Sequence, residues 1–168
     1  MTTRLLKHLL LAAGLGLALA AASHAVDKPD DRVALQGLKT ARVVWDVTTS
    51  DPARLNAHLA LVEETWDDLL RQKIKPEMVF AFREGSVRIL SEQAELLPFE
   101  QSVDAGQARE RLARLAARPG VRMEACAISM RGHGVKADTL PPWVHVVGNT
   151  FNSIIGRAPK GFAVITLP

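Results

Sequence analysis

Short apolar runs alternate along the chain with segments in which apolar residues recur every three or four positions. The runs are rich in β-branched and aromatic residues or alternate with polar ones, as strands do. Five of them predict strands: residues 41–47, 78–82, 121–126, 143–147 and 162–167. Because helical spacing separates most of these strands, the pattern predicts an α/β fold with a mostly parallel five-stranded sheet and helices on both faces.

The helix boundaries are marked by capping residues and by residues that break helices. Asp51 suits the N-cap of a first helix and Pro52 its first position, with one apolar face continuing to about Arg71. A second helix is expected to start from a cap at Asp104 or Ser102 and to stop before Pro119. Residues 87–90 are interpreted as a short strand extension, and residues 92–100 as a weakly patterned stretch with one helical turn.

The N-terminus has the pattern of a secretory signal peptide. Arg4 and Lys7 precede an apolar Leu/Ala run, and small residues end at Ala25. The run is shorter than the ~20 residues of a spanning helix, so a membrane anchor is the weaker interpretation. We therefore expect a signal peptide over 1–25, an N-terminal arm over 26–40, a folded domain over 41–168, and a periplasmic or secreted protein without a stable membrane anchor.

Size and charge limit the classes of function. With 168 residues, 48% of them hydrophobic, the chain can form one domain with a real core. Removing Arg4 and Lys7 with the signal peptide lowers the formal net charge from +3 to +1. No basic surface for nucleic acid is expected at that charge.

Cys126 is the only cysteine, so an intramolecular disulfide and a CxxC oxidoreductase mechanism are excluded. It ends a predicted strand, and a short helix is expected to follow until Gly132 and Gly134 stop it. A thiol at such a helix start is placed to form a thiolate, and Arg131 and His133 are predicted to add positive charge nearby. The alternative is a small, buried and inert side chain.

Several segments, in their order and spacing, resemble the DsrE/DsrF-like family from Arg42 to the C-terminus. They are the strand leading into Cys126, residues 127–135 with their Arg-Gly-His-Gly-Val turn, Leu140-Pro-Pro-Trp-Val144, and the helix–Gly–strand unit of residues 151–167. The resemblance implies a three-layer α/β/α domain, often assembled as trimers or hexamers. It also implies that a cysteine matching Cys126 accepts sulfur as a persulfide and passes it to a partner.

The favoured function is therefore sulfur (persulfide) or thiol handling through Cys126, with the sulfur donor and acceptor unidentified. Whether this amounts to a sulfurtransferase-type enzyme stays open. Glu124, two residues earlier on the same strand face, is either an acid–base partner or, as the preferred interpretation, an ion-pair partner of Arg122 or Arg131. The alternative function is a non-catalytic oligomeric binding or scaffold protein of the same fold.

A soft-metal site is a third and weaker hypothesis. Met130 and His133 follow Cys126 at i+4 and i+7, a spacing that suits Cu(I) if all three lie on one helix face. Met123 points to the opposite face of the strand, which leaves at most three ligands. No resident cofactor or metal is expected, since residues 132–134 are too short for a dinucleotide-binding glycine motif.

Overall fold

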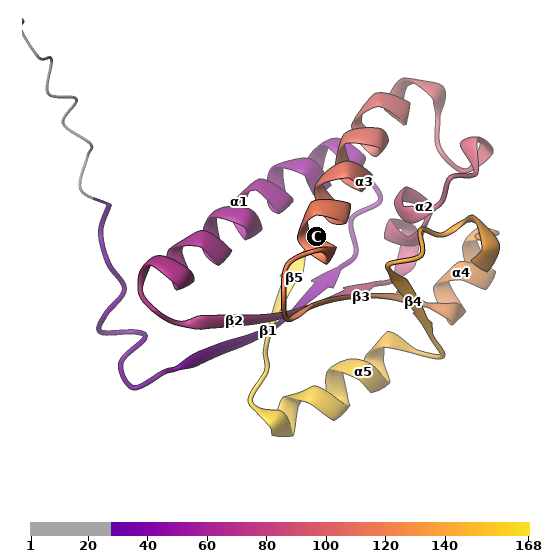
Figure 1. The fold of residues 1–168 in the computed structure, drawn as a ribbon. Coiled ribbons are helices and arrows are strands. Elements are labelled where there is room, and N and C mark those ends of the chain that lie inside the picture. The colour runs from indigo at the N-terminus through magenta and orange to yellow at the C-terminus, as the bar shows by residue number, and fades with distance from the viewer. Residues whose placement is uncertain (1–27) are drawn as a thin grey trace, which may run out of the picture. The chain divides into compact units, whose positions relative to one another are not determined.

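Five parallel strands form the centre of residues 28–168, the part of the chain that the computed structural model describes (Figure 1). Their order in the sheet is β4-β3-β2-β1-β5, and all lie in the compact unit Asp31–Pro168. The strands are β1 Thr40–Val47, β2 Lys75–Phe82, β3 Val121–Cys126, β4 Val144–Val147 and β5 Ala163–Leu167. The predicted signal peptide, residues 1–25, lies outside the described residues.

Helices cover both faces of this sheet. They are α1 Pro52–Arg71, α2 Val87–Leu90, α3 Ser102–Ala116, α4 Ala127–His133 and α5 Thr150–Arg157. In Figure 1, α1 and α3 lie on one side of the sheet and α5 lies on the other. The predicted α/β/α architecture with a parallel five-stranded sheet is confirmed.

The start of α1 follows its sequence signals closely. Asp51 is the N-cap, and its Oδ1 accepts from the N–H groups of Ala53 and Arg54 at 2.9 and 3.4 Å. The start of α3 differs, because Ser102 is its first residue and Gln101 precedes it without a capping hydrogen bond. The predicted caps at Ser102 and Asp104 are therefore wrong. The chain enters α3 from a 3-10 turn, Phe99–Gln101, so its backbone is already helical before the helix begins.

Residues 87–90 form helix α2, which corrects the expected strand extension. Val87 and Leu90 are three positions apart and share a helix face, and both are fully buried with Ile89. The β-branched composition favoured a strand, but packing against the large core decides the conformation.

The two faces of the sheet differ strongly in what they bury. Strand residues 43, 45, 47, 78, 80, 82, 123 and 125 join a large apolar core with α1, α2 and α3. On the α5 face the buried apolar cluster contains only Val44, Val79 and Ala81, with Ile154 and Phe162 packed against it. Glu124 and Cys126 are buried in the same odd–even register as that smaller cluster.

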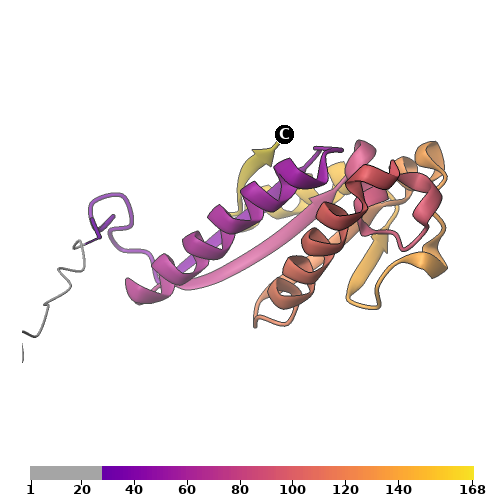
Figure 2. The same ribbon diagram turned by 90° about the horizontal axis from the view of Figure 1, so that it is seen from above.

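Helices α1 and α3 run side by side over the large core (Figure 2). Asn56 Nδ2 donates to the carbonyl oxygen of Asp104 at 2.9 Å, and Arg111 pairs with Glu63. These contacts tie the helices together along their length and hold the core closed. Within residues 28–168, none of the helices combines the length and apolar character needed to cross a membrane.

Candidate functional site

Cys126 lies at the carboxyl end of β3, at the N-cap position of α4. Strand alternation directs Met123 and Ala125 into the large core and leaves Cys126 on the α5 face with Glu124. The cysteine is 4% exposed. As the sequence predicted, it stands where a strand becomes a short helix, which ends at Gly134 with a φ of +70°. Gly132, expected to help stop that helix, lies inside it.

A pocket of about 240 Å³ opens onto Cys126. Its walls come from the segments that follow β2, β3 and β4, because the carboxyl ends of parallel strands meet at one edge of the sheet. The lining residues are Arg83, Glu84, Cys126, Ile128, Ser129, Asn149, Thr150 and Phe151. Three loops that are distant in sequence thus surround one thiol.

The Cys126 thiol is held in a state that ionises readily. Burial of the sulfur raises its pKa, but the backbone N–H groups of Thr150 and Ser129, followed by the Ser129 and Thr150 hydroxyls, lower it more. The resulting pKa is about 7, against an ordinary 9.0. Near neutral pH the Cys126 thiol therefore ionises more readily than an ordinary cysteine, and the thiolate is the form that acts as a nucleophile.

Ser129 is oriented by the backbone on the other side of the pocket. The Glu84 N–H donates to Ser129 Oγ at 2.8 Å, so the Ser129 hydroxyl keeps its own proton for the sulfur. Glu84 has a φ of +54°, in the left-handed region that costs a non-glycine residue roughly 1 kcal/mol. Backbone strain of this kind concentrates at functional sites, where surrounding contacts maintain it.

Arg83 forms the wall of the pocket next to Glu84. Its guanidinium donates to both oxygens of Asp46, at 2.7 and 2.8 Å, and also pairs with Glu84. The hydrogen bonds that Arg83 donates to Asp46 are the largest cause that raises the Arg83 pKa above its ordinary value, although burial opposes them. The guanidinium also lies 5.1 Å from the centroid of the Phe151 ring. Arg83 therefore joins β1, β2 and α5 around the pocket, with its charge balanced by two carboxylates.

The structure does not bring Arg131 and His133 to Cys126. Both are exposed in the last turn of α4, and neither lines the pocket. Helix geometry explains the difference, because five and seven residues of rise carry them about 7 to 10 Å along the axis from the cysteine. Neither residue is among the causes that lower the thiol pKa.

Glu124 shares a sheet face with Cys126 but has other partners. It is 1% exposed, and its carboxylate accepts from Arg122 at 2.7 Å and from Arg157 at 2.6 and 3.2 Å. Burial raises the Glu124 pKa, but hydrogen bonds from Arg122, Ser153 and Arg157 hold it below its ordinary value. The predicted pair with Arg122 is confirmed, and Arg157 of α5 stands where Arg131 was considered. Glu124 is thus a buried link between β3 and α5.

The three side chains of the copper hypothesis point in different directions. Met130 packs in the large core with Met123, His133 is exposed, and neither lines the Cys126 pocket. In the part of the chain described here, no group of three or more His, Cys, Asp or Glu side chains is arranged to hold a metal ion.

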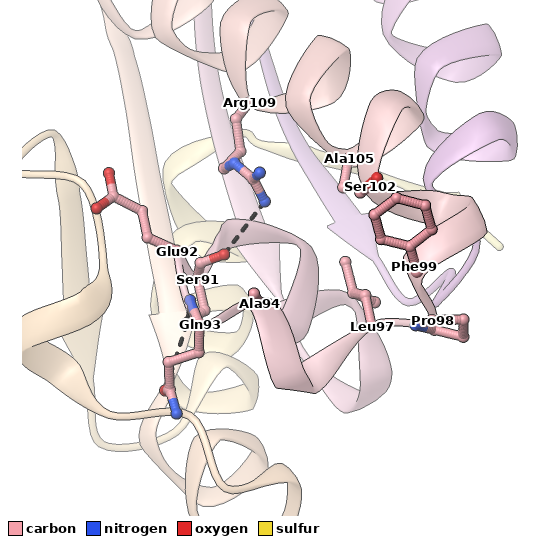
Figure 3. A pocket seen from close by; sticks show the side chains of 10 residues that line it. All are labelled: Ser91, Glu92, Gln93, Ala94, Leu97, Pro98, Phe99, Ser102, Ala105 and Arg109. Carbon is pink, nitrogen blue, oxygen red and sulfur yellow. Dashed lines mark hydrogen bonds between the residues drawn. The ribbon is translucent and has the colours of Figure 1, made fainter.

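A second pocket lies between α3 and the segment Ser91–Phe99 (Figure 3). Arg109 reaches into it from α3 and donates to the carbonyl oxygens of Ile89 and Ser91, both at 3.1 Å. This arginine satisfies backbone groups at the end of α2, which is a structural task. The residues lining this pocket include no thiol or imidazole, so the Cys126 pocket is the better candidate for chemistry.

Sequence reasoning missed Ser129 and Thr150, the two residues whose N–H and hydroxyl groups lower the thiol pKa. A usable signal was present, because both hydroxyls stand in the first turn of a helix that follows a predicted strand. What the sequence did not show is that α4 and α5 begin beside the same thiol.

Comparison with known proteins gives the chain a family. The sequence model of the DsrE/DsrF-like family matches residues 42–167, and no curated protein matches the sequence. The protein of unknown function MTH1491 from Methanobacterium thermoautotrophicum has a similar structure, with a TM-score of 0.57 and 25% identity over 75% of this chain and 98% of that one. The ychN protein from E. coli gives a TM-score of 0.46 and 16% identity over 77% and 98%. Because the family model covers most of the chain, this protein belongs to the DsrE/DsrF-like family.

Proposed function

We propose that this protein is a periplasmic or secreted sulfur carrier that holds one sulfur atom as a persulfide on Cys126. The observation that carries the proposal is a buried thiol with a pKa of about 7 that faces its own pocket. A carrier needs a thiolate, groups that stabilise the charge, and room for one more sulfur atom. The pocket is several times larger than the roughly 30 Å³ that a water molecule occupies, so an added sulfur fits.

The proposed reaction is a transfer between thiols without net oxidation. The Cys126 thiolate attacks the outer sulfur of a donor persulfide, R–S–SH, and a new sulfur–sulfur bond forms. The bond inside the donor breaks, and its electron pair leaves with the thiolate R–S⁻. The same exchange in the opposite sense delivers the sulfur to an acceptor thiol.

The location outside the cytoplasm rests on the sequence of residues 1–25 alone. If the signal peptide is cleaved after Ala25, the mature protein starts at Val26. Determining the N-terminal sequence of the protein recovered from the periplasm or medium checks this. Protein that keeps Met1 and stays in the cytoplasmic fraction would contradict it.

The carrier proposal is tested by intact mass. The exported, mature protein is purified without reductant, treated with glutathione persulfide, and compared with Cys126→Ser, which lacks only the thiol. We expect a gain of one sulfur atom in the wild type that dithiothreitol reverses, and none in the variant. A thiol that takes up no sulfur, and resists alkylation until the protein is unfolded, would exclude the carrier function and leave the scaffold alternative.

We also propose that the protein forms a homo-oligomer, a trimer or a hexamer. The outer edge of β5 pairs with no strand among residues 28–168, and Ala163–Leu167 contains no charged side chain. Val164 and Ile165 are each 46% exposed, although exposed edges usually contain charges that prevent association. Light scattering of the purified protein gives the mass directly, and a monomer at micromolar concentration would contradict the proposal.

A further inference from the structure

The hydroxyl of Thr150 is a buried polar group that has no hydrogen-bond partner within residues 28–168. Thr150 is 0% exposed, and its Oγ1 makes no hydrogen bond to any of the residues that the structure describes. A buried hydroxyl without a partner is costly, and such groups are rare in native proteins. Since Thr150 lines the Cys126 pocket, its unused donor stands at the site of the proposed chemistry.

The hydroxyl is not needed to start the helix in which it stands. Asn149 is the N-cap of α5, and its Oδ1 accepts from the Phe151 N–H at 2.9 Å. That bond already does what a threonine hydroxyl often does at a helix start. The Thr150 hydroxyl is therefore available to donate a hydrogen bond to a group bound in the pocket.

The Cys126 sulfur itself does not satisfy this hydroxyl. Thr150 Oγ1 lies close enough to lower the thiol pKa, but its effect is the smallest of the causes, below those of both N–H groups and the Ser129 hydroxyl. No hydrogen bond of acceptable geometry joins Oγ1 to the sulfur. Thr150 Oγ1 therefore lies near the thiol without a hydrogen bond to it, and its proton is available to an atom attached to the sulfur.

We propose that Thr150 Oγ1 donates a hydrogen bond to the outer sulfur of a Cys126 persulfide, and that the site is built to retain a single transferred sulfur. This inference rests on the carrier function proposed above. On loading, the donor persulfide gives its outer sulfur to the Cys126 thiolate and leaves as a thiolate. The outer sulfur of the product, Cys126–S–SH, then gives its proton to the departing thiolate. The resulting anionic sulfur is the acceptor that Thr150 lacks in the unloaded protein, next to the N-terminus of the eight-residue helix α5.

The burial of Cys126 favours the same substrate class. At 4% exposure the thiol can retain one small atom inside the pocket, whereas a mixed disulfide would have to accommodate a whole peptide thiol there. The transferred group is thus expected to be a single sulfane sulfur from a persulfide or polysulfide. A glutathione adduct should form poorly in comparison.

The test compares Thr150→Val, which replaces the hydroxyl with a methyl group of similar size, with Thr150→Ser, which keeps the hydroxyl. Each exported, mature protein is equilibrated with fixed ratios of glutathione persulfide to glutathione, and intact mass gives the loaded fraction. Thr65→Val is the matched control, because it makes the same chemical change on α1, where Thr65 Oγ1 donates to the Leu61 carbonyl oxygen. The pH dependence of alkylation of each variant separates a change in thiolate population from a change in persulfide retention.

We expect Thr150→Val to lower the equilibrium constant for loading about tenfold, the size of effect when one hydrogen bond to a charged acceptor is lost. Thr150→Ser and Thr65→Val should stay within about twofold of the wild type. Because valine removes an unpaired buried hydroxyl, Thr150→Val should also melt no lower than the wild type. If it fails to fold, Thr150→Ala against Thr150→Ser repeats the comparison.

The outcomes separate this inference from the function on which it rests. Normal loading of the wild type together with equal loading of Thr150→Val would overturn the role of Thr150 and leave the carrier function intact. Glutathionylation in place of a one-sulfur gain would overturn the substrate class. A wild type that takes up no sulfur would overturn the carrier function, and this inference with it.

Discussion

The two faces of the sheet are built for different tasks. The face under α1, α2 and α3 buries large aliphatic and aromatic side chains, with Phe80 and Phe82 fully enclosed at its centre. The α5 face buries three small or medium apolar residues and, beside them, the carboxylate of Glu124 and the thiol of Cys126. The face under α1, α2 and α3 thus contributes most of the apolar burial that drives folding. The α5 face contains the buried ionisable groups of Glu124 and Cys126.

This difference follows from how each type of burial is stabilised. Apolar packing is favourable almost wherever it is dry and dense, so one thick layer can stabilise the whole domain. A buried carboxylate or thiolate needs donors at fixed positions, which α5 supplies with Thr150 at one end and Arg157 at the other. The core under α1, α2 and α3 stabilises the fold. The position of α5 can therefore be set by its polar contacts to Glu124 and Cys126.

The largest expected effect comes from removing packing on the thick face. Phe80→Ala should lower the free energy of unfolding by about 4 kcal/mol, from lost burial and the cavity left behind. Val79→Ala, one residue away on the α5 face, should cost about 2 kcal/mol because less apolar area is lost. Urea denaturation measures both. Equal losses would contradict the division between the faces.

A smaller loss is expected from Glu124→Gln, which leaves Arg122 and Arg157 without their carboxylate. We expect the free energy of unfolding to fall by about 2 to 3 kcal/mol. This is toward the low end for breaking a buried ion pair, because Arg122 is half exposed. Since the folded-state pKa is lowered, ionised Glu124 stabilises the wild type above its ordinary pKa of 4.5, and this is lost as pH falls through the folded value.

Urea denaturation across pH 2 to 7 should therefore show a fall in wild-type stability below about pH 4.5 that is weaker in Glu124→Gln. Glu77→Gln, which removes a surface pair with Arg42, is the matched control and should cost less than about 1 kcal/mol. If the free energy of unfolding falls equally at low pH in the wild type and in Glu124→Gln, the ionisation of this carboxylate is not linked to folding.

The last prediction concerns the ionisation of the Cys126 thiol, where we expect little effect on stability and a specific effect on reactivity. The rate of iodoacetamide alkylation should rise with pH around a midpoint of about 7. Ser129→Ala should move the midpoint upward, because it removes a hydroxyl and disturbs the bond from the Glu84 N–H.

Arg131→Ala and His133→Ala should leave that midpoint unchanged, since both side chains are exposed at the far end of α4. A midpoint near 9 in the wild type would contradict the thiolate-stabilising site. A shift in either of these two variants would restore the role that the sequence suggested for them.

Local patterns predicted most of the architecture, and failed where packing overrides them. Asp51 and Pro52 gave the start of α1 correctly, because a cap and a proline act on their own neighbours. Residues 87–90 were misjudged because their β-branched composition suggests a strand while the large core requires a helix. Local patterns also could not show the ion pair between Glu124 and Arg157, because the two residues are 33 positions apart in sequence.

The sequence by itself determined the parallel α/β fold, the single thiol and its place where a strand becomes a helix, since these depend on periodicity, capping and residue identity. Only the tertiary structure decided which groups surround that thiol. Ser129 and Thr150 meet at Cys126 because parallel strands bring the loops after β3 and β4 to one edge of the sheet. Arg131 and His133 are closer to Cys126 in sequence than Thr150 is. They lie far from the thiol because they stand in the last turn of α4, and the helix leads away from Cys126.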